Sequence, residues 1–126
     1  MKQISIKHLN FAHNAWLRGL GFYELELGFL QERLEEIAAD NTGQAVSEKV
    51  EHFQNQFIIH RDYLDGLKHR IHENMKVLQY ELAGSNGHVD RDTVGLYNQL
   101  AEDYFTEDQL FIALRHEFNR FAAEWM

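Results

Sequence analysis

Four side chains of this 126-residue sequence combine metal-ligand chemistry with helix-spaced apolar surroundings: Glu24, His60, Glu107 and Asp108. His60 and Glu107 each lie three residues after one large apolar residue and four before the next, Glu24 lies at the edge of a similar stripe, and Asp108 adjoins Glu107. A charged side chain on a buried face has to be paired, hydrogen-bonded or bound to a metal. Because carboxylate and imidazole ligands suit iron, manganese and zinc, these four residues form a candidate metal site.

The alternative interpretation of the same residues is structural, since a buried glutamate–histidine pair can fix the register of two helices. In size and helical make-up the chain resembles hemerythrin-like and ferritin-like proteins in outline, and this resemblance implies histidine and carboxylate ligands inside a bundle. The Glu-x-x-His pair of ferritin-like bundles is absent. Of the hemerythrin-like spacings only His-x-x-x-Glu occurs, from His69 to Glu73. The sequence therefore assigns the chain to no family.

Three long segments have to position these side chains, at about residues 6–40, 44–83 and 90–124. Asn- and Gly-containing turn signals separate them. Each segment is rich in good helix formers with apolar residues at steps of three and four, and none shows the alternation of a half-buried strand. The sequence predicts a single all-α domain over residues 1–126, an up-down antiparallel bundle of three long helices.

Folding the chain about its two turns brings the candidate residues to one level. Around the first turn residue i faces about 84 − i, which sets Glu24 opposite His60. Around the second turn residue i faces about 172 − i, which sets His60 opposite about residue 112, close to Glu107 and Asp108. The predicted convergence is the main argument for a site.

The third segment contains a possible break near Thr106. Thr106 and Gln109 have the spacing of a capping box, which would start a new helix there and give four helices in all. The apolar stripe keeps one phase across this point, so continuity is the favoured prediction.

A second apolar stripe runs along the first segment, nearly opposite its main one, and consists of Phe11, Ala15, Phe22, Leu25 and Phe29. A helix that is apolar on two faces is usually buried on two faces. Packing within one chain could cover both stripes, but the favoured prediction is a homodimer through Phe11, Phe22, Leu25 and Phe29. Gly21 and Gly28, which lie between the stripes, would admit a close helix.

Composition excludes several classes of function. The net charge of −8 argues against nucleic-acid and anionic-membrane surfaces, and the absence of cysteine excludes disulfides and thiolate chemistry. No targeting segment and no complete catalytic motif is recognisable, so a cytoplasmic, non-enzymatic interaction or regulatory module is expected. The alternative function is metal binding. Eight histidines would bring the charge to zero on protonation, which would make the surface charge dependent on pH.

Overall fold

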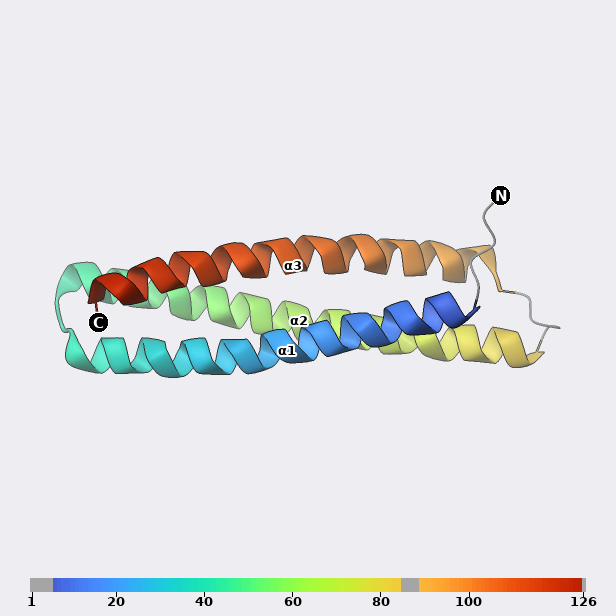
Figure 1. Ribbon diagram of the computed structural model, residues 1–126, viewed down its shortest axis with the longest axis horizontal. Coiled ribbons are helices and arrows are strands. Elements are labelled where there is room, and N and C mark those ends of the chain that lie inside the picture. The colour runs from blue at the N-terminus through green and yellow to red at the C-terminus, as the bar shows by residue number, and fades with distance from the viewer. Residues whose placement is uncertain (1–5, 85–88, 126) are drawn as a thin grey trace.

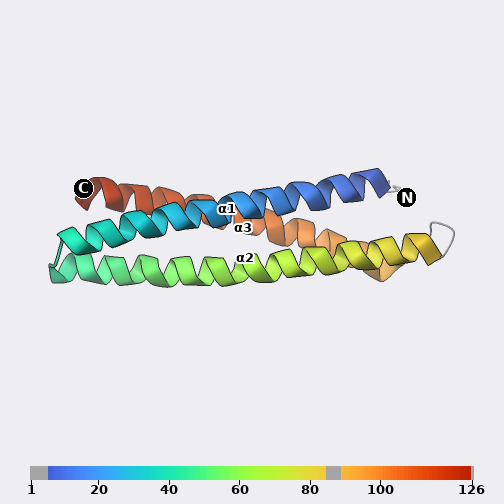
Figure 2. The ribbon, with the colours of Figure 1, turned by 90° about the horizontal axis from the view of Figure 1, so that it is seen from below.

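The structure is a computed structural model that describes residues 6–84 and 89–125. It consists of three helices, α1 (Ile6–Asp40), α2 (Gln44–Gly84) and α3 (Arg91–Trp125), each of which packs against the other two. Consecutive helices run antiparallel, so α1 and α3 point the same way (Figure 1). Figures 1 and 2 show three rods side by side, with the start of α1 and the end of α3 at opposite ends of the bundle. The described residues contain no β-strand. The predicted all-α bundle of three long helices is confirmed.

The helices associate through core positions that alternate steps of four and three residues along their whole length. In α2 the buried residues are Val46, Val50, Phe53, Phe57, His60, Leu64, Leu67, Ile71, Asn74 and Leu78. This is the heptad pattern of coiled coils, which keeps one face of a long helix turned towards its neighbours. Because each fully buried leucine or phenylalanine contributes about 1.5–3 kcal/mol, this seam supplies most of the driving force for folding.

Aromatic rings fill the core where all three helices meet. Tyr23 of α1 stacks on Phe111 of α3, with ring centroids 4.4 Å apart. Phe53 of α2 meets Phe118 edge-on at 5.3 Å and also lies against Phe121. Such pairs add to the hydrophobic gain and hold the helices at a defined level.

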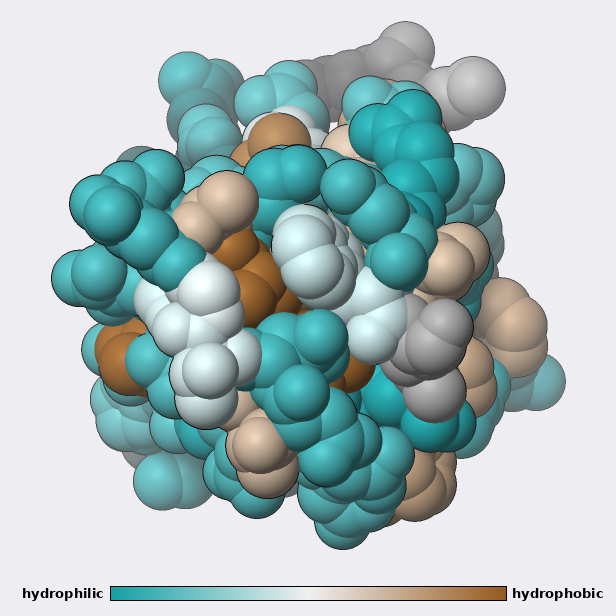
Figure 3. All heavy atoms as spheres, turned by 90° about the vertical axis from the view of Figure 1, so that its left-hand side faces the viewer, coloured by the Kyte–Doolittle hydropathy of each residue, from teal (hydrophilic) through white to brown (hydrophobic). Residues whose placement is uncertain are grey.

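Polar side chains form hydrogen bonds at the ends of the helices. After α1, the side-chain amide of Asn41 donates to the carbonyl of Ile37 at 2.9 Å, which satisfies one of the carbonyls that a helix end leaves open. Before α3, the Glu81 carboxylate accepts hydrogen bonds from the Asp90 backbone N–H and the Thr93 hydroxyl. Seen end-on from the turn between α1 and α2, hydrophilic side chains cover most of the rim and hydrophobic atoms show near the centre (Figure 3).

The possible break near Thr106 is not supported, because α3 runs without interruption from Arg91 to Trp125. Thr106 is exposed. The core positions Tyr104, Glu107 and Phe111 keep the three-four alternation across it. A capping sequence inside a helix has no effect when the apolar seam around it stays in phase.

Within residues 6–84 and 89–125, no helix is long and apolar enough to cross a membrane.

Candidate functional site

His60 and Glu107 meet in the core between α2 and α3. His60 Nδ1 lies 2.7 Å from Glu107 Oε1 and 3.2 Å from Oε2, and the glutamate is only 2% exposed. A hydrogen bond joins this imidazole nitrogen to the carboxyl group of Glu107. The imidazole also meets the ring of Phe111 edge-on. Two of the four predicted site residues are therefore in contact.

Glu24 is held elsewhere. Lys68 Nζ donates to both carboxylate oxygens of Glu24, at 3.0 and 3.2 Å, across the interface of α1 and α2. Lys68 lies eight residues along α2 from His60, which corresponds to about 12 Å of helix. Asp108 is half-buried and has no described contact with the pair. Among the residues that the structure describes, no three histidine or carboxylate side chains come together as a metal-binding group.

The His60–Glu107 pair is suited to holding the two helices in register. The two side chains occupy core positions of neighbouring helices, and almost no solvent reaches them. Removing either partner would leave the other polar group buried without compensation, which is costly in an apolar interior. A register shift of one residue would separate the pair, so its geometry favours one alignment of α2 and α3.

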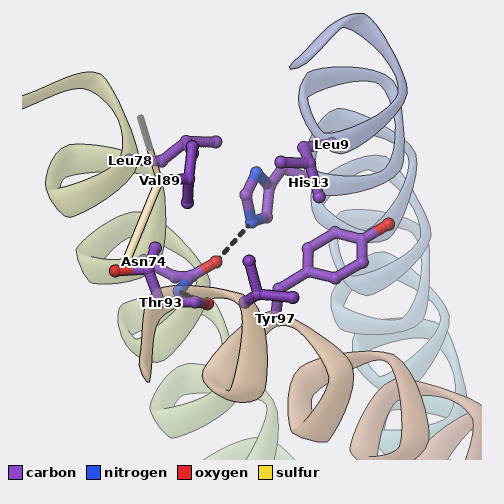
Figure 4. Close-up of a pocket in the computed structure, with 8 residues that line it drawn as sticks. Leu9, His13, Asn74, Leu78, Val89, Thr93 and Tyr97 are labelled. Atoms are coloured by element: carbon purple, nitrogen blue, oxygen red, sulfur yellow. Dashed lines mark hydrogen bonds between the residues drawn. The ribbon is translucent and has the colours of Figure 1, made fainter. Parts of the chain in front are cut away.

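A second polar layer crosses all three helices near the start of α1, and sequence reasoning missed it. His13 Nε2 lies 2.8 Å from Asn74 Oδ1, and Asn74 Nδ2 donates to the backbone carbonyl of Thr93 at 3.2 Å. Figure 4 shows His13 from α1 directed at Asn74 of α2, with Tyr97 of α3 beside the ring. His13, Asn74 and Thr93 are all buried.

The hydrogen-bond network fixes the state of His13. Asn74 uses its amide N–H on Thr93 and its oxygen on His13, so the imidazole donates from Nε2. Nδ1 is then an unprotonated nitrogen, and it is buried with no hydrogen-bond partner. Burial lowers the pKa of His13, and the hydrogen bond with Asn74 offsets part of that effect. The residue is a neutral component of the core.

The signal for this layer was present in the sequence. Asn74 lies seven residues after Leu67, three after Ile71 and four before Leu78, all of them core positions. Asn74 therefore occupies the same heptad position as His60, which lies two heptads earlier in α2. The predicted stripe instead passed through Met75, which is only half-buried. A strict heptad reading would have placed Asn74 in the core.

The third notable arrangement is open to solvent and lies on α1. Phe11, Phe22, Leu25 and Phe29 are 67%, 53%, 67% and 64% exposed. With Ala15 and Arg18 they form a row with steps of four, three, four, three and four, two residues out of phase with the core. We call these six residues the outer face of α1. It repeats the heptad spacing of the core on the side of the helix that faces away from α2 and α3.

Glycines differ in what the fold requires of them. A β-carbon at Gly19 would collide with the hydroxyl of Tyr104, so packing inside the bundle explains that glycine. At Gly21 and Gly28 a β-carbon would meet nothing within 4 Å. Each glycine inside a helix costs roughly 0.5–1 kcal/mol relative to alanine. Nothing within the described chain compensates for that cost at Gly21 and Gly28.

No protein-family model, no curated protein and no solved structure matches this chain. Function is therefore inferred from the side chains. Two of the three arrangements described above are enclosed between the helices, and the outer face of α1 is the one that a partner can reach.

Proposed function

We propose that this protein is a non-enzymatic interaction module that forms a homodimer through the outer face of α1. The observation that carries the proposal is the second heptad row, since its large apolar side chains are more than half exposed at coiled-coil spacing. Scattered apolar residues are normal on protein surfaces, but a continuous row with this spacing matches the surface of another helix.

The size of the outer face supports self-association. The row from Phe11 to Phe29 extends about 27 Å along the helix. Its exposed apolar side chains present about 500 Å² on each copy, given that a large aromatic side chain buries 150–250 Å². Two copies together would bury about 1,000 Å², which is about the minimum area of a biological protein interface.

The polar layers support an interaction module better than a catalyst. His60 with Glu107, and His13 with Asn74, lie at core positions where their hydrogen bonds align helices. The alternative function, metal binding, has less support because Glu24 is engaged by Lys68. A rigid bundle that presents the outer face of α1 to a partner is the simpler use of this architecture.

The test is the solution mass of the untagged chain by size-exclusion chromatography with light scattering. We expect twice the 14.9 kDa chain mass at micromolar concentration. The double variant Phe22→Glu/Leu25→Glu should be a folded monomer. Ile58→Glu is the matched control, because Ile58 is 55% exposed on α2, and it should remain dimeric. A monomeric wild type, or a dimer that Phe22→Glu/Leu25→Glu leaves intact, would overturn the proposal.

A further inference from the structure

We infer that the dimer partner lies antiparallel, with the two α1 helices paired so that residue i of one copy is opposite residue 40 − i of the other. This inference rests on the proposed function and adds the orientation and register of the partner. The value of 40 follows from pairing the first member of the outer face, Phe11, with the last, Phe29. It is a closed, two-fold arrangement that uses the same surface twice.

The register gives three self-complementary layers. They are Phe11 with the partner's Phe29, Ala15 with the partner's Leu25, and Arg18 with the partner's Phe22. The smallest side chain of the row lies opposite a large one, as interdigitated packing requires. Arg18, the only charged member, lies against an aromatic ring, where a guanidinium can stack.

Charges at the two ends of α1 distinguish the orientations. The basic side chains Lys7 and Arg18 belong to its first half, whereas Glu32, Glu35 and Glu36 lie near its end. Arg33 lies among these glutamates and pairs with Glu36 at 3.3 Å, so the end of α1 keeps a net negative charge. A parallel pair would set the three glutamates beside their own copies and Arg18 beside Arg18. An antiparallel pair sets the acidic end of each helix beside the basic end of the other, which favours this orientation.

One flank of the outer face shows the same relationship residue by residue. Positions seven apart along it are Lys7, Asn14, Gly21, Gly28 and Glu35, and we call them the flanking row. In an antiparallel pair such a row faces its own copy. The numbers of two paired residues then add up to about 42 in this row, against 40 in the seam itself. Lys7 then pairs with the partner's Glu35, Asn14 with the partner's Gly28, and Gly21 lies on the two-fold axis.

The chain already uses this device between α2 and α3. There Arg70 Nη2 lies 2.6 Å from Asp103 Oδ2, and Lys49 Nζ lies 3.7 Å from Glu124 Oε2. In both pairs the residue numbers have the same total, as an antiparallel flanking row demands. The ion pair proposed for Lys7 and Glu35 repeats an interaction that the structure contains.

The flanking row also includes the two glycines of α1 that packing inside the bundle does not explain. The space beyond Gly21 and Gly28 is open in the single chain. In the antiparallel register Gly21 lies opposite its own copy at the centre of the seam, and Gly28 lies beside Phe29 near its end. At both places a missing β-carbon lets two helix backbones come close.

Site-specific disulfides test the register, and the chain has no cysteine of its own to interfere. Ala15→Cys and Leu25→Cys are made as separate variants, mixed under reducing conditions so that subunits exchange, and then oxidised. Light scattering of each reduced variant first confirms that it dimerises. We expect a covalent dimer in the mixture, at least tenfold more abundant than in either variant alone, because residue 15 is opposite residue 25. Ile58→Cys is the control for random collision.

The outcomes separate this inference from the proposed function. Covalent dimers from each variant alone, in excess of the Ile58→Cys control, would show a parallel pair and overturn the register while the dimer stands. A dimer that gives no cross-link above the control in any sample would also overturn the register. A monomeric wild type would overturn both. As a second measurement, Lys7→Glu should weaken dimerisation about fivefold and Lys7→Glu/Glu35→Lys should restore it; failure of that rescue would count against the pairing of Lys7 with Glu35.

Discussion

His60 Nδ1 of α2 lies 2.7 Å from Glu107 Oε1 of α3, inside a core that is otherwise built largely from leucine and phenylalanine. The same two residue types meet on the surface, where His52 Nε2 lies 3.0 Å from Glu117 Oε1 with both side chains about half exposed. The two pairs have similar geometry and differ chiefly in burial, so they allow the effect of burial to be measured within one protein.

Removing the buried glutamate should be far more damaging than removing the exposed one. Glu107→Ala leaves His60 in the core without its hydrogen-bond partner and should lower the free energy of unfolding by at least about 1–3 kcal/mol, the cost of an unsatisfied buried polar group. Glu117→Ala should lower it by less than about 1 kcal/mol, because water and salt screen the exposed pair. Urea titration followed by circular dichroism measures both. Equal effects of the two substitutions would contradict the role assigned to the buried pair.

Replacing both members of the buried pair should largely restore stability. His60→Leu/Glu107→Leu removes the desolvated groups together and keeps a similar side-chain volume, so its free energy of unfolding should be close to that of the wild type or higher. The double variant should, however, have a less well-defined helix register, because the polar layer no longer excludes alternative alignments. Broader amide resonances in NMR spectra would reveal this. A double variant as unstable as Glu107→Ala would show that the hydrogen-bonded pair itself stabilises the fold.

A direct metal measurement decides between the two interpretations of this layer. Because Lys68 engages Glu24 and only His60 and Glu107 meet, we expect untagged protein to contain much less than one iron, manganese or zinc ion per chain. Inductively coupled plasma mass spectrometry on protein purified without chelator provides the number. One equivalent of metal that disappears in His60→Ala would establish the metal-binding alternative and contradict ours.

The fold could be predicted because helical periodicity is local, whereas the candidate site depended on long-range register. The α2–α3 prediction set His60 opposite about residue 112, and Glu107 is within about a turn and a half of that point. The α1–α2 prediction set Glu24 opposite His60, but Lys68 is its partner. The stagger of two long helices is decided by side-chain packing along their whole length, and turn positions alone do not contain that information.

The polar layers show the same limit. His60 and Glu107 were recognisable because charged residues interrupt a stripe of large apolar side chains. Asn74 does not stand out by residue type, since it is an uncharged amide next to Met75, and only its heptad position, the same as that of His60, indicates burial. Its burial follows from two partners in other helices, His13 and the backbone of Thr93, which only the three-dimensional arrangement brings together.

Acid should destabilise the fold through His13. Burial lowers the pKa of His13 in the folded protein, so the unfolded chain binds a proton near the ordinary value of 6.5 while the folded chain does so only at lower pH. The unfolded state therefore binds more protons in this range, and the contribution of His13 to stability is lost as the pH falls from above 6.5 towards the folded-state pKa.

The measurement for His13 is the free energy of unfolding between pH 8 and pH 5, compared among variants. His13→Gln keeps a donor for Asn74 but cannot titrate, so its stability should fall less steeply with acid than that of the wild type. His116→Gln, at an exposed position of α3, is the control and should keep the steep dependence. Identical slopes for wild type and His13→Gln would show that His13 is not the group responsible.

Gly21 gives the prediction in which stability and assembly change in opposite directions. Gly21→Ala adds a β-carbon into open space, so in a monomeric background such as Phe22→Glu/Leu25→Glu it should raise the free energy of unfolding by about 0.5–1 kcal/mol through helix propensity. In the otherwise unmodified chain the same β-carbon lies on the two-fold axis of the proposed antiparallel dimer. There it should keep the helices apart and weaken dimerisation about tenfold in sedimentation equilibrium.

Gly66→Ala is the matched control, because a β-carbon at Gly66 on α2 also meets nothing within 4 Å. It should give the same gain in stability and leave the dimer unchanged; a Gly21→Ala dimer as strong as that of Gly66→Ala would mean that the two helices do not approach each other at Gly21.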